Sequence, residues 1–214
     1  ARKIRGPDIV TTFLGPHSKS PDHPDLDSYM REIVADLLPQ VAREGLADRA
    51  DIYIEKGFFS NDLARDYFTT LNALNIPITA HVEQLSDCGG TRTALEFNPQ
   101  SVDHVVFINA ETVGLLALSK TTAVLLPASD FYLKMRYPPA RELLDAGARV
   151  ALSTDFNPGT SPTQDLSLVG VLARVEMKMS LPEVLVAFTY GGACALGKQH
   201  LLGSLGVGKR CDFI

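Results

Sequence analysis

The chain has 214 residues, of which 45% are hydrophobic, and a formal net charge of −5 at pH 7. This length is sufficient for one sizeable core, whereas the scattered basic residues argue against binding to nucleic acid or to an anionic membrane. No apolar run reaches the roughly 18 residues that a membrane-spanning helix needs. The cysteines Cys88, Cys194 and Cys211 form no CxxC pair and favour a reducing, cytoplasmic setting over a disulfide framework.

Short apolar runs alternate along the chain with longer segments of helical periodicity. Strands are expected at 9–14, 51–55, 78–81, 102–108, 123–126 and 150–154. Helices are expected at 26–44, from Ser60 to about Leu74, and at 110–119, 139–146, 166–179 and 181–196. Ser60 is expected to cap its helix, and the pair Gly191-Gly192 is expected to weaken the last one.

Strands that alternate with helices predict a mainly parallel sheet covered by helices. Six strand–helix units are present, whereas a closed barrel of this kind has eight. The chain begins without Met and ends on Cys-Asp-Phe-Ile, so we expect a fragment of a longer protein. The predicted fold is a (β/α)8 barrel represented by its strands three to eight over residues 1–200. Residues 201–214 are assigned to the first strand or strands of a small accessory β-sandwich.

Three groups that can bind a metal or carry a proton lie at expected strand ends. Asp155 could ligate a divalent metal or accept the proton of an attacking water, and it could instead begin an Asx-turn. His81 is a candidate ligand for zinc or iron, with a hydrogen-bonded structural histidine as the alternative. His104 could polarise a substrate carbonyl, shuttle a proton or support the metal, or it could be a buried structural histidine.

Two further residues are weaker candidates. His17 follows the first strand and could donate to a substrate oxygen, or it could be a surface histidine. Gln84 comes three residues after His81 and could hydrogen-bond a polar ring, or it could be an ordinary loop amide. We assign no role to His23 or His200.

The turn after Asp155 contains Asn157, Gly159 and Thr160, and its backbone N–H groups could hold a carboxylate. Nucleotide-binding motifs are absent from the sequence, since it has no P-loop lysine and its late glycines lack the context of a dinucleotide fingerprint. A nucleophilic serine in a GxSxG elbow is absent as well.

Several motifs follow one another in an order typical of one family. They are TTFLGPH (11–17), EKGFFS (55–60), HVEQLS (81–86), SVDH (101–104), AVLLP (123–127) and TDFNPGTSP (154–162). Together they resemble the imidazolonepropionase family of the amidohydrolase superfamily, over essentially the whole chain. The TDFNPGTSP and HVEQ strings are the most specific of them.

The resemblance implies a metal-dependent hydrolase with one zinc or iron ion. Its small-molecule substrate would be 4-imidazolone-5-propanoate, which is opened by water to N-formimidoyl-L-glutamate in histidine degradation. The resemblance also implies a (β/α)8 barrel with a β-sandwich built from both chain ends, and it loosely suggests a homodimer. No nucleic acid or membrane partner is expected.

The resemblance also implies roles for individual residues, which match the family motifs. His81 and Asp155 would be metal ligands, and Asp155 and His104 would be catalytic. His17, Gln84 and Thr160 would contact the imidazolone. Asn157 and Gly159 would contact the formimidoyl-glutamate product.

The chain departs from the family in one respect that matters for the metal. The His-x-His pair of the family's first barrel strand does not occur in this sequence. Two ligands are fewer than the three protein ligands of a typical catalytic zinc site. We therefore expect the isolated chain to bind metal weakly and to be inactive. The longer protein is expected to bind the metal and to hydrolyse the substrate. The alternatives are another cyclic amidohydrolase or deaminase, and a catalytically inactive amidohydrolase fragment.

Overall fold

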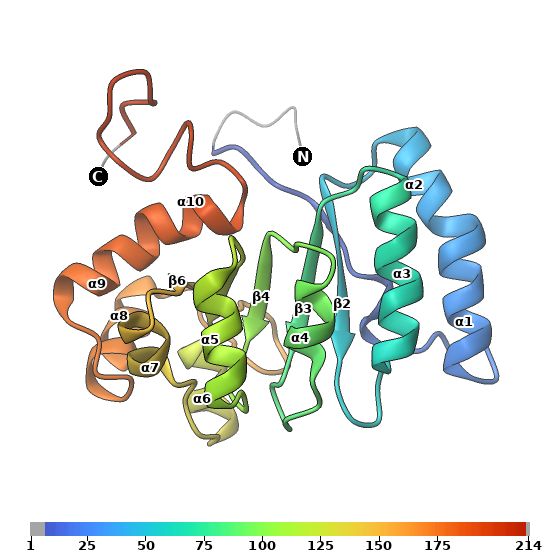
Figure 1. Ribbon diagram of the computed structural model, residues 1–214, viewed down its shortest axis with the longest axis horizontal. Coiled ribbons are helices and arrows are strands. Elements are labelled where there is room, and N and C mark those ends of the chain that lie inside the picture. The colour runs from blue at the N-terminus through green and yellow to red at the C-terminus, as the bar shows by residue number, and fades with distance from the viewer. Residues whose placement is uncertain (1–6, 213–214) are drawn as a thin grey trace.

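A six-stranded parallel sheet forms the centre of the computed structural model, which describes residues 7–212. The strands are β1 (Thr12–Phe13), β2 (Arg49–Ile54), β3 (Ile78–Val82), β4 (Ser101–His104), β5 (Thr122–Leu125) and β6 (Arg149–Leu152). Their order in the sheet is the order in the chain, and all neighbours are parallel. Figure 1 shows the strand arrows directed toward one end, where the loops that follow the strands gather. This arrangement is consistent with a partial (β/α)8 barrel.

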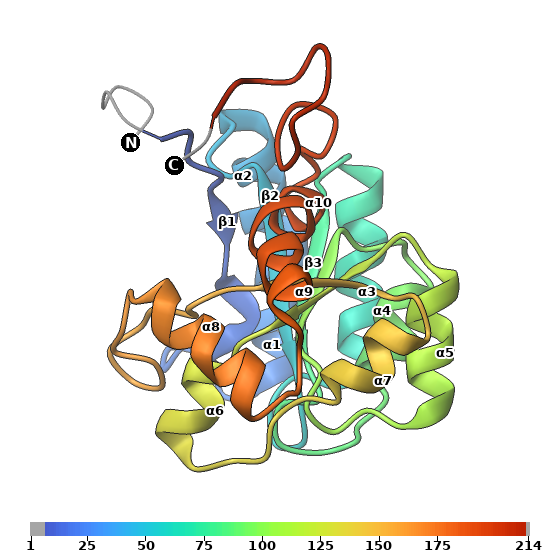
Figure 2. The ribbon, with the colours of Figure 1, turned by 90° about the vertical axis from the view of Figure 1, so that its left-hand side faces the viewer.

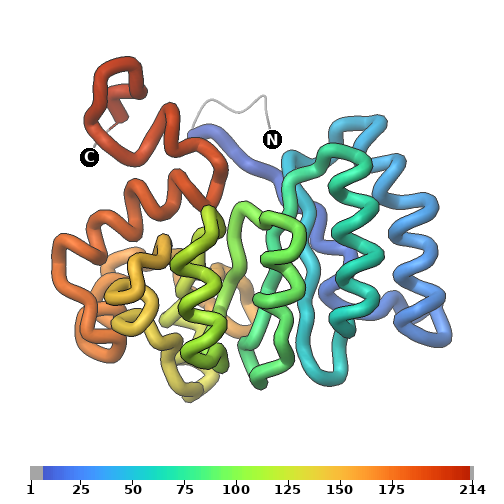
Figure 3. Tube along the Cα trace, in the orientation of Figure 1, coloured from blue at the N-terminus to red at the C-terminus, as the bar shows by residue number. Residues whose placement is uncertain are grey.

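Ten helices connect the strands or follow the last of them, within the described residues. They are α1 (Leu26–Glu32), α2 (Leu38–Glu44), α3 (Asn61–Ala73), α4 (Gly90–Leu95), α5 (Ala110–Leu118), α6 (Pro127–Leu133), α7 (Ala140–Asp145), α8 (Leu166–Val175), α9 (Leu181–Val186) and α10 (Gly192–Ala195). In series, α3 contacts α4, α4 contacts α5 and α5 contacts α7. Figure 2 shows these four helices on the same side of the sheet. The first and the last described segments meet through Arg210 and Asp8, at the edge away from the post-strand loops (Figure 3).

The helix boundaries follow from capping residues. The Ser60 side chain accepts a hydrogen bond from the Leu63 N–H, which confirms the predicted cap of α3. Asp25 caps α1 in the same way, and Gly45 at φ 60° ends α2 in a left-handed conformation. The expected helix 26–44 contains a π-helical segment, Ile33–Leu37, which is followed by α2 with Pro39 in its first turn.

The last expected helix contains a second π-helical segment, Ala187–Gly191, between α9 and α10. A Cβ atom on Gly191 would lie 2.1 Å from the Val150 carbonyl oxygen, so this helix approaches β6 as closely as the backbone allows. The glycine pair that we expected to weaken the helix therefore has a packing reason at Gly191.

Some expected elements are shorter than predicted, and two helices were not predicted. The first strand is confined to β1, and the expected strand 102–108 stops at His104, because His104 and Val105 have φ angles of 74° and 48°. The two helices that were not predicted are α4 and α6, which begin at Gly90 and Pro127.

The expected β segment at the end of the chain forms turns instead. Gly203 and Gly208 both have φ 85°, and no strand occurs between them and Asp212. Residues 213 and 214 lie outside the described residues. The assignment of this segment to an accessory sheet therefore stays a prediction.

Alternation along the strands divides the sheet into two chemically different faces. One row of paired residues is buried in the main core under the helices and consists of Ile52, Ala80, Val102, Ala123 and Val150. The opposite face, called here the inner face, carries the row Tyr53, His81, Asp103, Val124 and Ala151, with Asp51, Thr79, Ser101 and Thr122 beside it. None of the helices within residues 7–212 has the length and apolar character that a membrane crossing requires.

Candidate active site at the inner face of the sheet

His81 lies near the end of β3, where it points from the inner face toward two carboxylates. Its Nδ1 atom is 2.8 Å from Oδ1 of Asp51 and 3.8 Å from Oδ2 of Asp103. Burial alone would lower the pKa of His81, but the charges of Asp51, Asp103 and Asp155 outweigh burial and raise this pKa to about 9. The inner face therefore favours a positive charge at this position.

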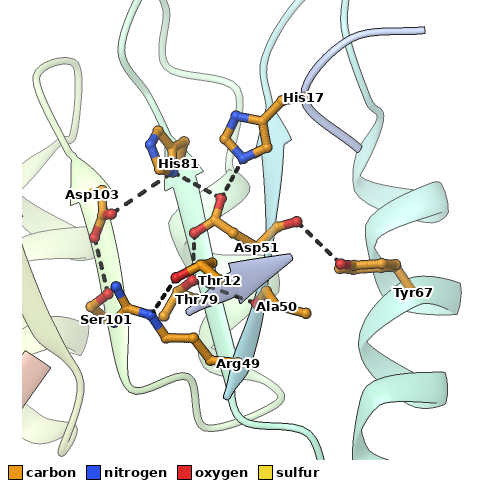
Figure 4. A network of polar contacts seen from close by, with 10 residues as sticks. All are labelled: Thr12, His17, Arg49, Ala50, Asp51, Tyr67, Thr79, His81, Ser101 and Asp103. Carbon is orange, nitrogen blue, oxygen red and sulfur yellow. Dashed lines mark hydrogen bonds and ion pairs between the residues drawn. The ribbon is translucent and has the colours of Figure 1, made fainter. Parts of the chain in front are cut away.

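Asp51 of β2 is the centre of the hydrogen-bond network (Figure 4). Its Oδ1 atom is also 2.7 Å from Nε2 of His17, and its Oδ2 atom accepts a 2.5 Å hydrogen bond from the Thr79 hydroxyl. Only 2% of the Asp51 side chain is exposed. Burial works to raise its pKa, but the His81 charge and the hydrogen bonds from both histidines hold the pKa well below its usual range. Asp51 is thus an ionised carboxylate in the interior.

His17 reaches this network from the single turn Gly15–His17 that follows β1. The hydroxyl of Tyr29 in α1 donates a 3.0 Å hydrogen bond to the Gly15 carbonyl and holds the turn in place. The rings of His17 and His81 are 4.6 Å apart and nearly perpendicular. Two candidates from separate parts of the sequence are therefore direct neighbours.

His104 and Asp103 are consecutive residues of β4 with opposite surroundings. The His104 ring lies 5.2 Å from that of His81, and its buried Nδ1 atom has no hydrogen-bond partner among the described residues. Burial and the nearby His81 charge place the pKa of His104 well below its usual range, so its ring is neutral. Burial chiefly raises the pKa of Asp103 to about 6, and the Ser101 hydroxyl donates to this carboxylate at 3.0 Å.

Asp155 follows β6 in a left-handed conformation with φ 51°. Burial raises its pKa, while the His81 and His17 charges act to lower it. The neighbouring Asp130 is buried, and both of its carboxylate oxygens are without a hydrogen-bond partner among the described residues. Burial and the charge of Asp155 raise the pKa of Asp130 to about 7. The carboxyl groups of Asp155 and Asp130 therefore hold a proton more readily here than they would in water.

Left-handed backbone conformations occur at the ends of β3 and β4 and in the segment that follows β6. Glu83, His104 and Asp155 have φ angles of 46°, 74° and 51°. A non-glycine residue in such a conformation costs on the order of 1–3 kcal/mol, and such residues cluster at functional sites. The turns redirect the chain directly after the strand and bring the loops toward the same edge.

The turn after Asp155 is closed by Asn157. Its Oδ1 atom accepts hydrogen bonds from the N–H groups of Gly159 and Thr160, at 2.9 and 2.7 Å. Its Nδ2 group donates to the Asp155 carbonyl at 2.7 Å. The N–H groups that we expected to be available for a carboxylate are therefore satisfied within the turn, and Asn157 would have to release them for a ligand.

Gln84 is buried in the loop that follows β3. This loop is fixed by Glu55, whose carboxylate accepts hydrogen bonds from the Leu85 N–H at 2.8 Å and the Ser86 N–H at 3.3 Å, and from the Ser86 hydroxyl. The structure brings His17, His81 and His104 together and places the charge of Asp155 near His81. The roles of Gln84, Asn157, Gly159 and Thr160 as substrate contacts stay predictions.

The sequence analysis missed Asp51, Asp103 and Thr79. Their signal is a polar residue at every second position of an apolar strand, as in Asp51, Tyr53 and Glu55 between Ala50, Ile52 and Ile54. Buried polar side chains on one face of a strand need hydrogen-bond partners opposite that face.

The close trio around Asp51 is held by hydrogen bonds, and a metal held by His81 and Asp155 stays a prediction. His17, Asp51 and His81 do lie within 4.8 Å of one another. However, two ligand atoms of a tetrahedral zinc ion are about 3.3 Å apart, given metal–ligand distances of about 2.0–2.1 Å. The separations of 2.7 and 2.8 Å are those of hydrogen bonds. Asp51 therefore supports the histidines, and His81 keeps its other nitrogen for a ligand.

The sequence is similar to that of curated imidazolonepropionases. The chain is 48% identical over 214 residues to an imidazolonepropionase of Bdellovibrio bacteriovorus. The aligned region covers all of this chain and 51% of that protein. It is 38% identical over 208 residues to an imidazolonepropionase of Bacillus velezensis, covering 97% of this chain and 49% of the relative. The chain thus spans about half the length of these relatives.

Two solved structures share the fold at low sequence identity. An adenosine deaminase from Xanthomonas campestris with bound zinc superposes with a TM-score of 0.73 at 19% identity, covering 95% of this chain and 51% of the deaminase. An amidohydrolase from a Sargasso Sea environmental sample has a TM-score of 0.68 at 22% identity, covering 93% of this chain and 49% of the other.

The comparison with family models covers nearly the entire chain. The model described as the amidohydrolase family matches residues 2–214. The parallel sheet, the histidines at its inner face and this match agree with one another, and the chain belongs to the amidohydrolase family.

Proposed function

We propose that this chain contributes part of the active site of an imidazolonepropionase, which opens 4-imidazolone-5-propanoate with water. The observation that carries the proposal is the gathering of His17, His81 and His104 at one edge of the sheet, with the charge of Asp155 close to His81. The 48% identity to a relative named imidazolonepropionase supports this choice of substrate.

His81 and Asp155 would hold the metal, together with ligands from outside this chain. A bound zinc or iron ion would lower the pKa of a water molecule and make it a nucleophile near neutral pH. Asp155 would take the proton of the attacking water and transfer it to the ring nitrogen that leaves the carbonyl carbon. The burial that raises the pKa of Asp155 suits a group that must both accept and release a proton.

The remaining residues would position the ring. His104 is neutral and close to His81, so it can donate a hydrogen bond to the ring carbonyl as negative charge develops there. His17 and Gln84 would orient the planar imidazolone. The turn of Asn157, Gly159 and Thr160 would approach the acidic arm of the product after releasing its internal hydrogen bonds.

Zinc or iron as the metal, a cytoplasmic location and a homodimer belong to the same proposal. The lack of a CxxC pair and of a membrane-spanning helix within residues 7–212 is compatible with this location. Elemental analysis and size-exclusion chromatography with light scattering would test the metal and the oligomeric state.

The test uses a longer protein that contains this chain and measures loss of 4-imidazolone-5-propanoate. Asp155→Asn and His81→Ala should each lower kcat by about 10³-fold or more, because proton transfer and metal binding are lost. His200→Ala, at an exposed histidine, is the matched control and should leave kcat unchanged. Ammonia release from an aminated ring, with no imidazolone hydrolysis, would reject the proposal in favour of a deaminase.

A further inference from the structure

Asp51 is a single buried acceptor shared by two histidines. Its Oδ1 atom accepts hydrogen bonds from Nε2 of His17 at 2.7 Å and from Nδ1 of His81 at 2.8 Å. A carboxylate oxygen can only accept, so each histidine must place a proton on the nitrogen that faces Asp51. The proton of His81 is therefore held on Nδ1 and that of His17 on Nε2.

The position of Asp51 is itself fixed from several sides. Oδ2 accepts the Thr79 hydroxyl at 2.5 Å, and the backbone carbonyl of Asp51 accepts the Tyr67 hydroxyl at 3.2 Å. With 2% of its side chain exposed, Asp51 has almost no contact with water. Hydrogen bonds that hold a buried carboxylate this closely also restrict the rings that bind it.

The consequence for His81 is a defined direction for its free nitrogen. In the neutral ring that binds a metal, the proton on Nδ1 leaves the lone pair on Nε2, which is then the atom that can bind the metal. A carboxylate behind a metal-binding histidine fixes ring and tautomer and increases the basicity of the ligand atom. The same argument leaves Nδ1 of His17 as a hydrogen-bond acceptor.

We propose that Asp51 is the positioning residue of this site, because it selects one tautomer and one ring orientation in both His81 and His17. Asp51 acts through the two histidines and does not bind the metal itself. The inference rests on the proposed function only in taking His81 as a metal ligand, since the hydrogen bonds stand without a substrate.

The first test is a measurement on the unaltered longer protein loaded with zinc. Side-chain ¹⁵N chemical shifts of labelled histidines should show the proton on Nδ1 of His81 and the metal on Nε2, and the proton on Nε2 of His17. A proton on Nε2 of His81 would overturn the proposal. This measurement needs no variant, so it does not depend on whether an Asp51 substitution folds.

The second test measures zinc affinity by competition with a chromophoric chelator. Asp51→Asn should weaken zinc binding about 10–100-fold, because the neutral amide is a weaker acceptor for the two histidines and its NH2 group cannot accept from the Thr79 hydroxyl. Thr79→Val, which removes the hydroxyl that donates to Oδ2 and to the Ala50 carbonyl but leaves both histidine contacts, should weaken binding less. Asp66→Asn on the exposed face of α3 is the matched control and should bind zinc as the parent does.

The outcomes separate this inference from the proposed function. Unchanged zinc affinity and unchanged histidine shifts in Asp51→Asn would overturn the positioning role, even if imidazolone is hydrolysed. Conversely, weakened zinc binding with altered shifts would support Asp51 even in a protein that does not hydrolyse imidazolone. If Asp51→Asn does not fold, the positioning role is decided by the histidine ¹⁵N shifts of the unaltered protein and by the zinc affinity of Thr79→Val.

Discussion

The inner face of the sheet changes character between β4 and β5. One row of paired residues crosses it and consists of Tyr53, His81, Asp103, Val124 and Ala151. The β2–β4 part of the row belongs to the network of Asp51, whereas Val124 and Ala151 pack with Leu126 and Ala195 in a small apolar cluster. Equivalent positions of one sheet thus serve chemistry in one part and packing in the other.

This difference shows how the site obtains its functional groups. In the polar part the strands themselves supply the carboxylates, as Asp51 and Asp103 do. In the apolar part the carboxylates come from beyond the strands, because Asp155 and Asp130 follow β6 and β5. The polar part depends on hydrogen-bond partners for its stability, and the apolar part depends on close packing.

The largest effect should come from placing a carboxylate in the apolar part. Val124→Asp would put a charge beside Asp103 with no cationic partner, which typically costs about 3–5 kcal/mol. The free energy of unfolding from urea titration of the longer protein measures it. Val124→Thr adds a polar group without charge and should cost clearly less. Equal losses in the two variants would mean that the two parts of the inner face tolerate charge alike.

The next effect tests how closely α10 and its π-helical start pack on β6. Gly191→Ala would force its Cβ against the Val150 carbonyl oxygen, and overpacking of this kind costs about 1–3 kcal/mol. Gly192→Ala is the matched control, since its Cβ would have no neighbour closer than 4.0 Å. Because alanine favours a helix more than glycine does, this variant should increase the free energy of unfolding by about 0.5–1 kcal/mol. Thermal unfolding should therefore shift in opposite directions, and parallel shifts would contradict this account.

A smaller, local effect is expected from the carboxylate that holds the loop after β3. Glu55→Gln should weaken the hydrogen bonds from the Leu85 and Ser86 N–H groups, at a cost of about 1–3 kcal/mol for that loop. Amide hydrogen exchange of residues 84–86 should become faster while exchange in α3 stays unchanged. Glu176→Gln at an exposed position serves as the control, and slow exchange in Glu55→Gln would show that the loop is held by other contacts.

The smallest effect should lie outside both parts, between α7 and α9. Arg141 donates to both oxygens of Glu183 at 3.0 and 2.9 Å and, together with hydrogen bonds from Ser180, lowers the pKa of Glu183 from 4.5 to about 2. A lowered folded-state pKa adds stability that is complete above pH 4.5 and is lost as the pH falls toward about 2. Glu183→Gln should thus cost up to about 1 kcal/mol near neutral pH, and less in acid.

Urea midpoints near neutral pH and at about pH 3 would measure this difference. Glu142→Gln, at an exposed residue of α7, is the control variant measured beside it. A Glu183→Gln difference that stays constant with pH would show that the Arg141 pair does not contribute through charge.

The strand order, most helix positions and the histidines of the site could be predicted from the sequence. Apolar runs that alternate with helical periodicity suffice to predict the parallel sheet, and Ser60 marks the start of α3 by its chemistry. His81 and Asp155 stand out because each follows an apolar run. These features are local, so the nearby sequence contains the information.

The features that escaped prediction depend on contacts between distant residues. Asp51 is 30 residues from His81 and 34 from His17, so its role appears only when β2 and β3 are paired in register. The close approach of Gly191 to Val150 likewise requires the folded helix. The backbone turn at His104 ended a strand that its apolar sequence predicted to continue.

The sequential order of the strands also bears on how the protein is made. Because each strand pairs with the one before it, every new strand leaving the ribosome finds its neighbour already synthesised, one βα unit earlier. Closing such short stretches costs little entropy, and chains commonly fold from the N-terminal side during synthesis. The contacts of Arg49 with Ala195 and of Asp8 with Arg210 join the beginning of the described chain to its end. They can form only after translation has delivered α10 and the residues that follow it, so they form later than the pairing of neighbouring strands.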